Sequence, residues 1–168
     1  MESIILLETD RLIIRGFEDK DFESLVSLMT DADTMKYTGF KVPQSKERIK
    51  ELLSKWQQEG QQPLGVWAVE SKYTKVFIGW VMLKPTTTEV PELGYMIIKN
   101  QWGNGFATEV GAAILKYAAH ERHLSKIVAV SSSENIASMR ILEKIGMKRR
   151  NEKPREDKGI LYELEFKP

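Results

Sequence analysis

The sequence predicts a mixed α/β domain in which helices flank a mostly antiparallel central sheet. In the first third of the chain, apolar residues recur at spacings of three and four, which is typical of amphipathic helices. Three segments rich in β-branched and aromatic residues follow, and their short connections favour an antiparallel meander. The rest alternates between helix and strand patterns. This order predicts one α/β domain over residues 1–168.

The amino-terminal part is expected to contain strand-forming residues and two helices. Residues 11–15 predict a short strand, and the apolar run of residues 4–7 precedes it. Apolar spacing predicts a first helix over residues 22–29. A second helix follows Ser45, whose side chain can cap it, and Gly60 can end it.

The remaining elements follow from the same periodicities. The meander is expected at residues 65–70, 76–84 and 92–98. Beyond it, the pattern predicts a helix over residues 107–121, a strand at 126–131, a helix over 136–144 ended by Gly146, and strands at 147–149 and 160–166 around a polar loop at Pro154.

The composition carries no strong charge that would select a partner. The chain has 168 residues with 25 basic and 24 acidic side chains, a net charge of +1. Nucleic-acid binders concentrate positive charge, so no nucleic-acid partner is expected. No apolar run approaches the ~18 residues of a membrane-spanning helix, so no membrane partner is expected either. Residues 1–10 lack the basic start of a signal peptide, and we expect a cytoplasmic location.

The sequence contains no cysteine, which restricts its chemistry. Without a thiol the chain can form no disulfide, thiolate metal site or acyl-cysteine intermediate. His120 and His123 lie three residues apart, but nothing near them in the sequence supplies a convincing third ligand. We therefore expect no metal.

A glycine-rich loop at residues 101–109 joins an expected strand to an expected helix. Gly103 and Gly105 permit positive φ and a close approach of the backbone to a ligand. Successive amides and the helix N-terminus then converge on an anion such as a pyrophosphate. A tight structural turn is the alternative. A dinucleotide-binding loop needs a third glycine and a later acidic residue, and a P-loop needs G-K-[ST], so neither fits.

A second motif spans residues 135–147 and has the form N-x-x-S-x-x-x-L-E-K-x-G-M. Asn135 can cap the helix and Gly146 can end it in the left-handed conformation. A purely structural helix would explain each of these residues alone.

Together the two motifs resemble the GNAT superfamily of acyl-CoA N-acyltransferases, and within it the RimJ/RimL-type ribosomal-protein N-acetyltransferases. Four pieces carry the resemblance, in order along the chain: T-D-R-L-I-I-R at residues 9–15, E-L-G-Y at 92–95, W-G-N-G-F-A-T-E at 102–109, and the motif at 135–147. The resemblance implies the GNAT fold, with an acyl-CoA cleft between two splayed strands. It also implies acetyl-CoA as cosubstrate and an amine as acceptor.

The resemblance also implies which residues bind the cosubstrate. They comprise the end of the third meander strand, the glycine loop and the motif asparagine: Met96, Ile97, Ile98, Trp102, Gly103, Asn104, Gly105, Phe106, Ala107, Thr108 and Asn135. Many GNAT enzymes carry Arg or Gln where this chain has Trp102, so pyrophosphate binding should depend on backbone amides. Glu109 is expected to serve the first turn of its helix.

Two side chains are candidates for catalysis. Glu92 matches a strand position where many GNAT enzymes place a glutamate that deprotonates the amine through water; a solvated glutamate is the alternative. A backbone N–H near Met96 and Ile97 is expected to bind the oxyanion. Many relatives protonate the thiolate with a tyrosine where this chain has Leu142, whereas the RimJ/RimL branch uses a serine, here Ser138. Local bonding of a first-turn serine is the alternative.

These expectations lead to one function and two alternatives. The leading hypothesis is direct acetyl transfer from acetyl-CoA to a primary amine, such as a protein N-terminus, by a monomer or homodimer. Acetylation of an antibiotic, polyamine or amino-acid analogue is the first alternative, and a non-catalytic acyl-CoA sensor is the second. The loops at residues 29–43 and 154–158 are expected to select the acceptor.

Overall fold

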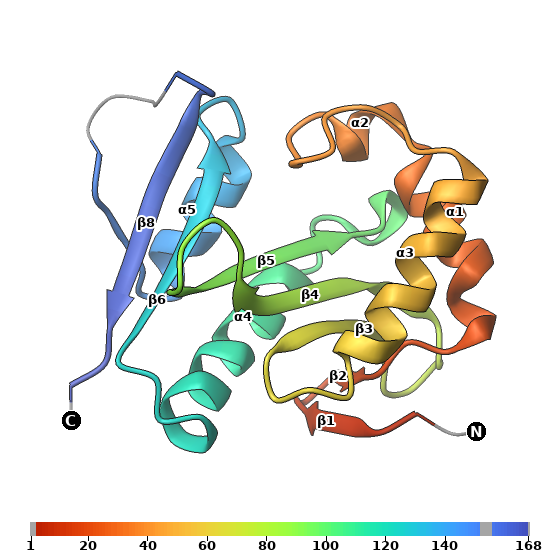
Figure 1. The fold of residues 1–168 in the computed structure, drawn as a ribbon, viewed down its shortest axis with the longest axis horizontal. Coiled ribbons are helices and arrows are strands. Elements are labelled where there is room, and N and C mark those ends of the chain that lie inside the picture. Colours follow the sequence, from red (N-terminus) through yellow and green to blue (C-terminus); the bar gives the residue numbers. More distant parts are fainter. Residues whose placement is uncertain (1–2, 152–155, 168) are drawn as a thin grey trace.

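A computed structural model describes residues 3–151 and 156–167, which form eight strands in one sheet ordered β1-β2-β3-β4-β5-β6-β8-β7 (Figure 1). The strands are β1 (Ile5–Glu8), β2 (Leu12–Arg15), β3 (Gly65–Ser71), β4 (Phe77–Pro85), β5 (Pro91–Ile97), β6 (Lys126–Ser132), β7 (Lys148–Arg149) and β8 (Gly159–Glu165). All neighbours pair antiparallel except β5 and β6. The predicted mixed, mostly antiparallel sheet is confirmed.

Helices cover both faces of this sheet. They are α1 (Phe22–Met29), α2 (Ala32–Met35), α3 (Lys46–Glu59), α4 (Phe106–Lys116) and α5 (Ile136–Lys144), with short turns η1 (Asp19–Asp21), η2 (Lys99–Gln101) and η3 (Tyr117–Glu121). Leu25, Ile49 and Trp56 pack on one face of the sheet, whereas Val110 and Leu142 pack on the other. The predicted helices α1, α3, α4 and α5 therefore bury the apolar stripes that their sequences predict.

Most predicted boundaries agree closely with the structure. The Ser45 hydroxyl accepts a hydrogen bond from the Arg48 amide (3.2 Å) at the start of α3, and Gly60 ends that helix. Gly146 follows the end of α5 with φ +104°, the positive φ that is typical of a glycine that ends a helix. Helix α2 was not predicted, because four residues are too few to show a 3.6-residue period. Pro154, in the expected polar loop, lies outside the described residues.

The strands β5 and β6 separate soon after they meet. Their parallel pairing covers only Glu92 with Val128 and Leu93 with Ala129. Beyond Leu93, β5 stays paired with β4 while β6 turns away to pair with β8 (Figure 1). One edge of β5 is thus left without a neighbouring strand over its second half.

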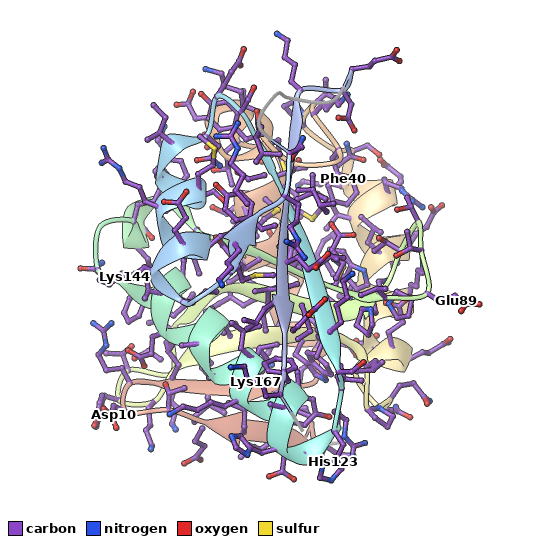
Figure 2. The ribbon with its side chains drawn as sticks, turned by 90° about the vertical axis from the view of Figure 1, so that its left-hand side faces the viewer. Asp10, Phe40, Glu89, His123, Lys144 and Lys167 are labelled. Carbon is purple, nitrogen blue, oxygen red and sulfur yellow. The ribbon has the colours of Figure 1, made fainter. Side chains whose placement is uncertain are left out.

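Two labelled side chains lie at the outer surface of the molecule. Glu89, in the connection between β4 and β5, projects outward, and His123 lies at the lower end of the view, well separated from Phe40 (Figure 2). Within the described residues, no three His, Asp or Glu side chains lie close enough together to hold a metal ion. In that same part of the chain, no helix has both the length and the apolar character that crossing a bilayer demands.

A buried ion network fixes β2 and β3 to the start of α1. Arg15 forms hydrogen bonds to both carboxylate oxygens of Asp21 (2.8 and 2.9 Å) and to Glu70 (2.8 Å). All three side chains are at most 7% exposed. Burial lowers the pKa of Arg15, but the hydrogen bonds and charges of Asp21 and Glu70 raise it by more. The guanidinium is therefore held charged between two buried carboxylates.

Replacing Arg15 with methionine should destabilise the protein strongly. The variant keeps an aliphatic side chain but leaves buried Asp21 without its cation and Glu70 with only the longer contact to Lys20 (3.8 Å). Breaking a buried ion pair in this way typically costs about 3–5 kcal/mol of unfolding free energy. Urea denaturation measures the loss. The matched change Arg48→Met breaks only the exposed pair with Glu51 (3.1 Å) and should cost less than about 1 kcal/mol. Similar losses for the two variants would contradict a structural role of the buried network.

Candidate active site

A cavity of about 1190 Å³ lies where β5 and β6 separate. One wall comes from the second half of the chain: β5, the glycine loop, the start of α4, β6 and the start of α5. The other comes from residues 33–40, helix α3 and strand β4. Of the predicted cosubstrate and catalytic residues, all line the cavity except Ile98 and Asn104.

The glycine loop has the backbone geometry of an anion site. Gly103 has φ +81° and Gly105 has φ +78°, values that strain any residue with a Cβ atom. Gly105 is the N-cap of α4, and no side chain caps that helix. The first intrahelical bond is from the Glu109 amide to the Gly105 carbonyl (3.0 Å), so the amides of residues 106–108 have no intrahelical partner. These amides fit a pyrophosphate.

Trp102 attaches the glycine loop to the end of β5. Its indole N–H donates to the Ile97 carbonyl (2.7 Å), and the residue remains 49% exposed beside the cavity. At the position where many GNAT enzymes carry Arg or Gln, this chain therefore has a neutral side chain that is hydrogen-bonded to the backbone of Ile97. Ile98 instead packs toward the helices of the opposite face, and its amide bonds to the Ile78 carbonyl (2.8 Å).

Thr9 and Arg11, near the amino terminus, form hydrogen bonds to Glu109 in the first turn of α4. The Glu109 carboxylate accepts hydrogen bonds from the Thr9 hydroxyl (2.5 Å) and the Arg11 guanidinium (2.7 Å). Arg11 also donates to the Asn104 carbonyl (2.9 Å) and lies 4.4 Å from the centre of the Phe106 ring. Thr9, Arg11 and Glu109 are called the loop clamp below. The clamp gives the first part of the T-D-R-L-I-I-R motif a physical role, which the sequence did not reveal.

The unpaired edge of β5 presents backbone N–H groups to the gap. Along an antiparallel strand, alternate residues direct their N–H groups to opposite neighbours. Because the Ile98 amide bonds to β4, the amides of Tyr95 and Ile97 face away from β4. Met96 instead faces β4. The sequence predicts an oxyanion donor near Met96 and Ile97, and in this region the backbone amides that face the gap are those of Tyr95 and Ile97.

The start of α5 brings Ser138 to the cavity. The Asn135 side chain accepts a hydrogen bond from the Ser138 amide (3.1 Å), so Asn135 caps the helix. The Ser138 hydroxyl lies 3.3 Å from the Tyr95 hydroxyl, a contact that the sequence did not predict. Burial raises the pKa of Tyr95, and the hydrogen bond with Ser138 lowers it by less. Tyr162, by contrast, donates its hydroxyl hydrogen to Glu143 (3.2 Å), away from Ser138.

Glu92 and Ser138 lie on opposite faces of the sheet. Side chains alternate along β5, so Leu93 and Tyr95 point toward α4 and α5, whereas Glu92 shares the face of Met96 and α3. The Glu92 carboxylate accepts a hydrogen bond from the Thr86 hydroxyl. Lys84 is its cross-strand neighbour but pairs with Glu59 (2.7 Å). The cavity connects the two faces through the gap.

The chain matches known acetyltransferases over most of its length. A family model described as an acetyltransferase (GNAT) domain matches residues 11–148. Two Bacillus subtilis proteins are similar: "Uncharacterized protein YkkB" (38% identity, covering 84% of each chain) and "Uncharacterized N-acetyltransferase YoaA" (33%, covering 86% of this chain and 83% of the relative). A GNAT-family acetyltransferase structure from Bacillus anthracis superposes with a TM-score of 0.82 at 27% identity, covering 95% of this chain and 97% of that one.

Weakening the loop clamp should weaken acetyl-CoA binding. Burial raises the pKa of Glu109, but hydrogen bonds from Thr9 and Arg11 lower it by more. The clamp therefore contributes above the ordinary glutamate pKa and is lost as the pH falls through the lowered value. At neutral pH, Glu109→Gln should reduce calorimetric affinity for acetyl-CoA about three- to tenfold, because charge-assisted hydrogen bonds become neutral.

The control is Glu121→Gln, at the exposed far end of the same helical segment. It should bind acetyl-CoA like the unmodified protein. A Glu109→Gln variant with unchanged affinity would show that the clamp does not support the loop.

Proposed function

Because the chain belongs to the GNAT acetyltransferase family, we propose that it acetylates the primary amine of a protein N-terminus or a closely similar acceptor. The protein is an acetyl-CoA-dependent N-acetyltransferase. The observation that carries the proposal is one cavity that joins the glycine loop, Ser138 and Glu92 through the gap beside β5. We take residues 1–168 to act as a single domain.

The cosubstrate residues are assigned from the free backbone groups. Amides of residues 103–108 bind the pyrophosphate, and the open edge of β5 binds the pantetheine arm. Positive φ at Gly103 and Gly105 and the uncapped start of α4 support this assignment. Bound acetyl-CoA supplies the acetyl group as an activated thioester.

The catalytic roles divide between the two faces of the sheet. On the α3 face, Glu92 accepts a proton from the incoming amine through water. In the gap, the amides of Tyr95 and Ile97 stabilise the oxyanion. On the α5 face, Ser138 donates a hydrogen bond to the departing sulphur. The opposite placement of Glu92 and Ser138 supports this division, because the amine gives up a proton on one side of the sheet while negative charge develops on the sulphur on the other.

The position of Ser138 supports the RimJ/RimL-type branch. Leu142 is buried and has no proton to donate, so it cannot replace the tyrosine of other relatives. Ser138 lines the cavity, and Trp102 stands where many GNAT enzymes carry Arg or Gln. These three residues agree with a branch that acetylates protein N-termini.

The charges on the acceptor side argue against a polyamine. The proposed acceptor side is the part of the cavity lined by residues 33–40, α3 and β4, together with Glu92. It carries two carboxylates, Asp33 and Glu92, and four basic side chains: Lys36, Arg48, Lys55 and Lys84. Asp33 is paired with Lys99 (2.6 Å), and Arg48, Lys55 and Lys84 are paired with Glu51 or Glu59. Among the described residues, Lys36 is therefore the one of these four cations without an ion pair. A free cation at this wall suits an acceptor that carries negative charge near its amine rather than a polycation.

An acceptor screen tests the proposed function. With acetyl-CoA, a peptide that has a free N-terminus and acidic following residues should be acetylated faster than a matched lysine-rich peptide or spermidine. Lys36→Gln should raise KM for the acidic peptide about two- to fivefold, since an exposed charge contributes at most about 1 kcal/mol. The exposed Lys116, distant in the sequence at the end of α4, provides the control Lys116→Gln. Preference for spermidine would contradict the proposal.

Glu92→Gln should lower turnover most at low pH. The amide cannot accept a proton, and the acceptor amine is most fully protonated there, so deprotonation is hardest. Turnover of both proteins is measured from about pH 6 to 9, where amine acceptors titrate. The matched variant Glu89→Gln, in the outward-projecting loop, should keep the original profile. Superimposable profiles for Glu92→Gln and the unmodified enzyme would remove Glu92 from the mechanism.

A further inference from the structure

The side chains of Tyr95 and Ser138 reach each other from different elements at the edge of the gap. Tyr95 comes from β5 and Ser138 from the first turn of α5, and their hydroxyl oxygens lie 3.3 Å apart. We propose that Tyr95 is a positioning residue that turns the Ser138 hydroxyl hydrogen toward the cavity, where the departing sulphur is stabilised. This inference rests on the proposed function and gives a role to Tyr95, to which the family resemblance assigned none beyond its place in the E-L-G-Y motif.

A count of hydrogens supports the proposal. Among the described residues, neither hydroxyl has another hydrogen-bond partner. The two hydroxyl groups carry two hydrogens, and the hydrogen bond between them uses one of these. The second hydrogen remains free at the wall of the cavity, which both residues line. The pair therefore offers one free donor to a ligand there.

The phenol is the better donor in this contact. A tyrosine hydroxyl is more acidic than an aliphatic alcohol, so Tyr95 donates and the Ser138 oxygen accepts. The free hydrogen then belongs to Ser138. Donation by Tyr95 also polarises the Ser138 O–H bond and makes it a stronger donor. Ser138 does not bond to a backbone carbonyl of its own helix, as a merely local first-turn serine would.

Tyr95 is not well suited to lose its own proton. Burial raises its pKa, which disfavours a tyrosinate at this site. Its hydroxyl therefore orients and polarises Ser138 and remains protonated through the reaction. The backbone of Ser138 is fixed independently by its amide bond to Asn135 (3.1 Å), so the Tyr95 contact decides only where the hydroxyl points.

A double-mutant cycle tests the coupling. Tyr95→Phe removes only the hydroxyl and keeps the ring that packs against the core. It should lower kcat about three- to tenfold, the range for one neutral hydrogen bond, and Ser138→Ala should lower it more, about ten- to a thousandfold. In the Ser138→Ala background, Tyr95→Phe should have no further effect, because its partner is gone.

Binding of free CoA provides a readout that does not depend on turnover. A hydrogen bond to the thiolate lowers the pKa of the bound thiol, so calorimetric affinity for CoA should rise between about pH 6 and 9. Tyr95→Phe and Ser138→Ala should each reduce this rise, and together no more than Ser138→Ala alone. Affinity for acetyl-CoA, which has no free thiol, should be unchanged in every variant.

The matched control is Tyr117→Phe, which also removes a tyrosine hydroxyl, one that bonds to the Pro63 carbonyl (2.7 Å). It should leave kcat and CoA binding unchanged, and thermal unfolding of each variant shows whether the fold is kept. Normal kcat and CoA binding in folded Tyr95→Phe, or an undiminished loss from Tyr95→Phe in the Ser138→Ala background, would overturn the inference alone. An unmodified protein that neither binds CoA nor acetylates any amine would overturn the proposed function as well.

Discussion

The separation of β5 from β6 is the constraint on which the rest of the site depends. Two residue pairs join the strands, Glu92 with Val128 and Leu93 with Ala129. Beyond them, among the described residues, β5 has β4 as its one neighbouring strand. Unpaired backbone N–H groups inside a protein are costly unless a partner satisfies them. The open edge of β5 is therefore suited to hydrogen bonding with a ligand, and the cavity lies where that ligand can reach it.

Contacts that are distant in sequence hold this opening in place. The loop clamp joins Thr9 and Arg11 to Glu109, across about a hundred positions, so the amino-terminal strands help to orient the glycine loop. Trp102 ties the same loop to the end of β5. Arg15 then anchors β2 to β3 and to the start of α1. The geometry of the glycine loop thus depends on contacts made by side chains far from it in the sequence.

Sequence patterns were sufficient to predict most helices and strands but not how these elements lie relative to one another. Periodicity and capping residues such as Ser45 and Gly146 located most helices and strands, because these signals are local. The short helix α2 carries no measurable period. The Tyr95–Ser138 contact and the opposite faces of Glu92 and Ser138 depend on where the fold places the start of α5 relative to β5, which no local pattern encodes. The fold was therefore largely predictable, whereas the role of Tyr95 required the three-dimensional arrangement.

The two walls of the cavity come from different stretches of the chain. Side chains before residue 60 supply much of the acceptor wall, whereas the glycine loop, β5 and α5 come after residue 90. Under the proposed function, substitutions at residues 33–56 can therefore alter acceptor choice without changing the groups assigned to the acetyl donor, whereas changes at Thr9 or Arg11 would loosen the glycine loop. Because the two walls come from separate stretches of the chain, the amine specificity of such a transferase can change by substitution in one stretch while the other keeps the chemistry of acetyl transfer.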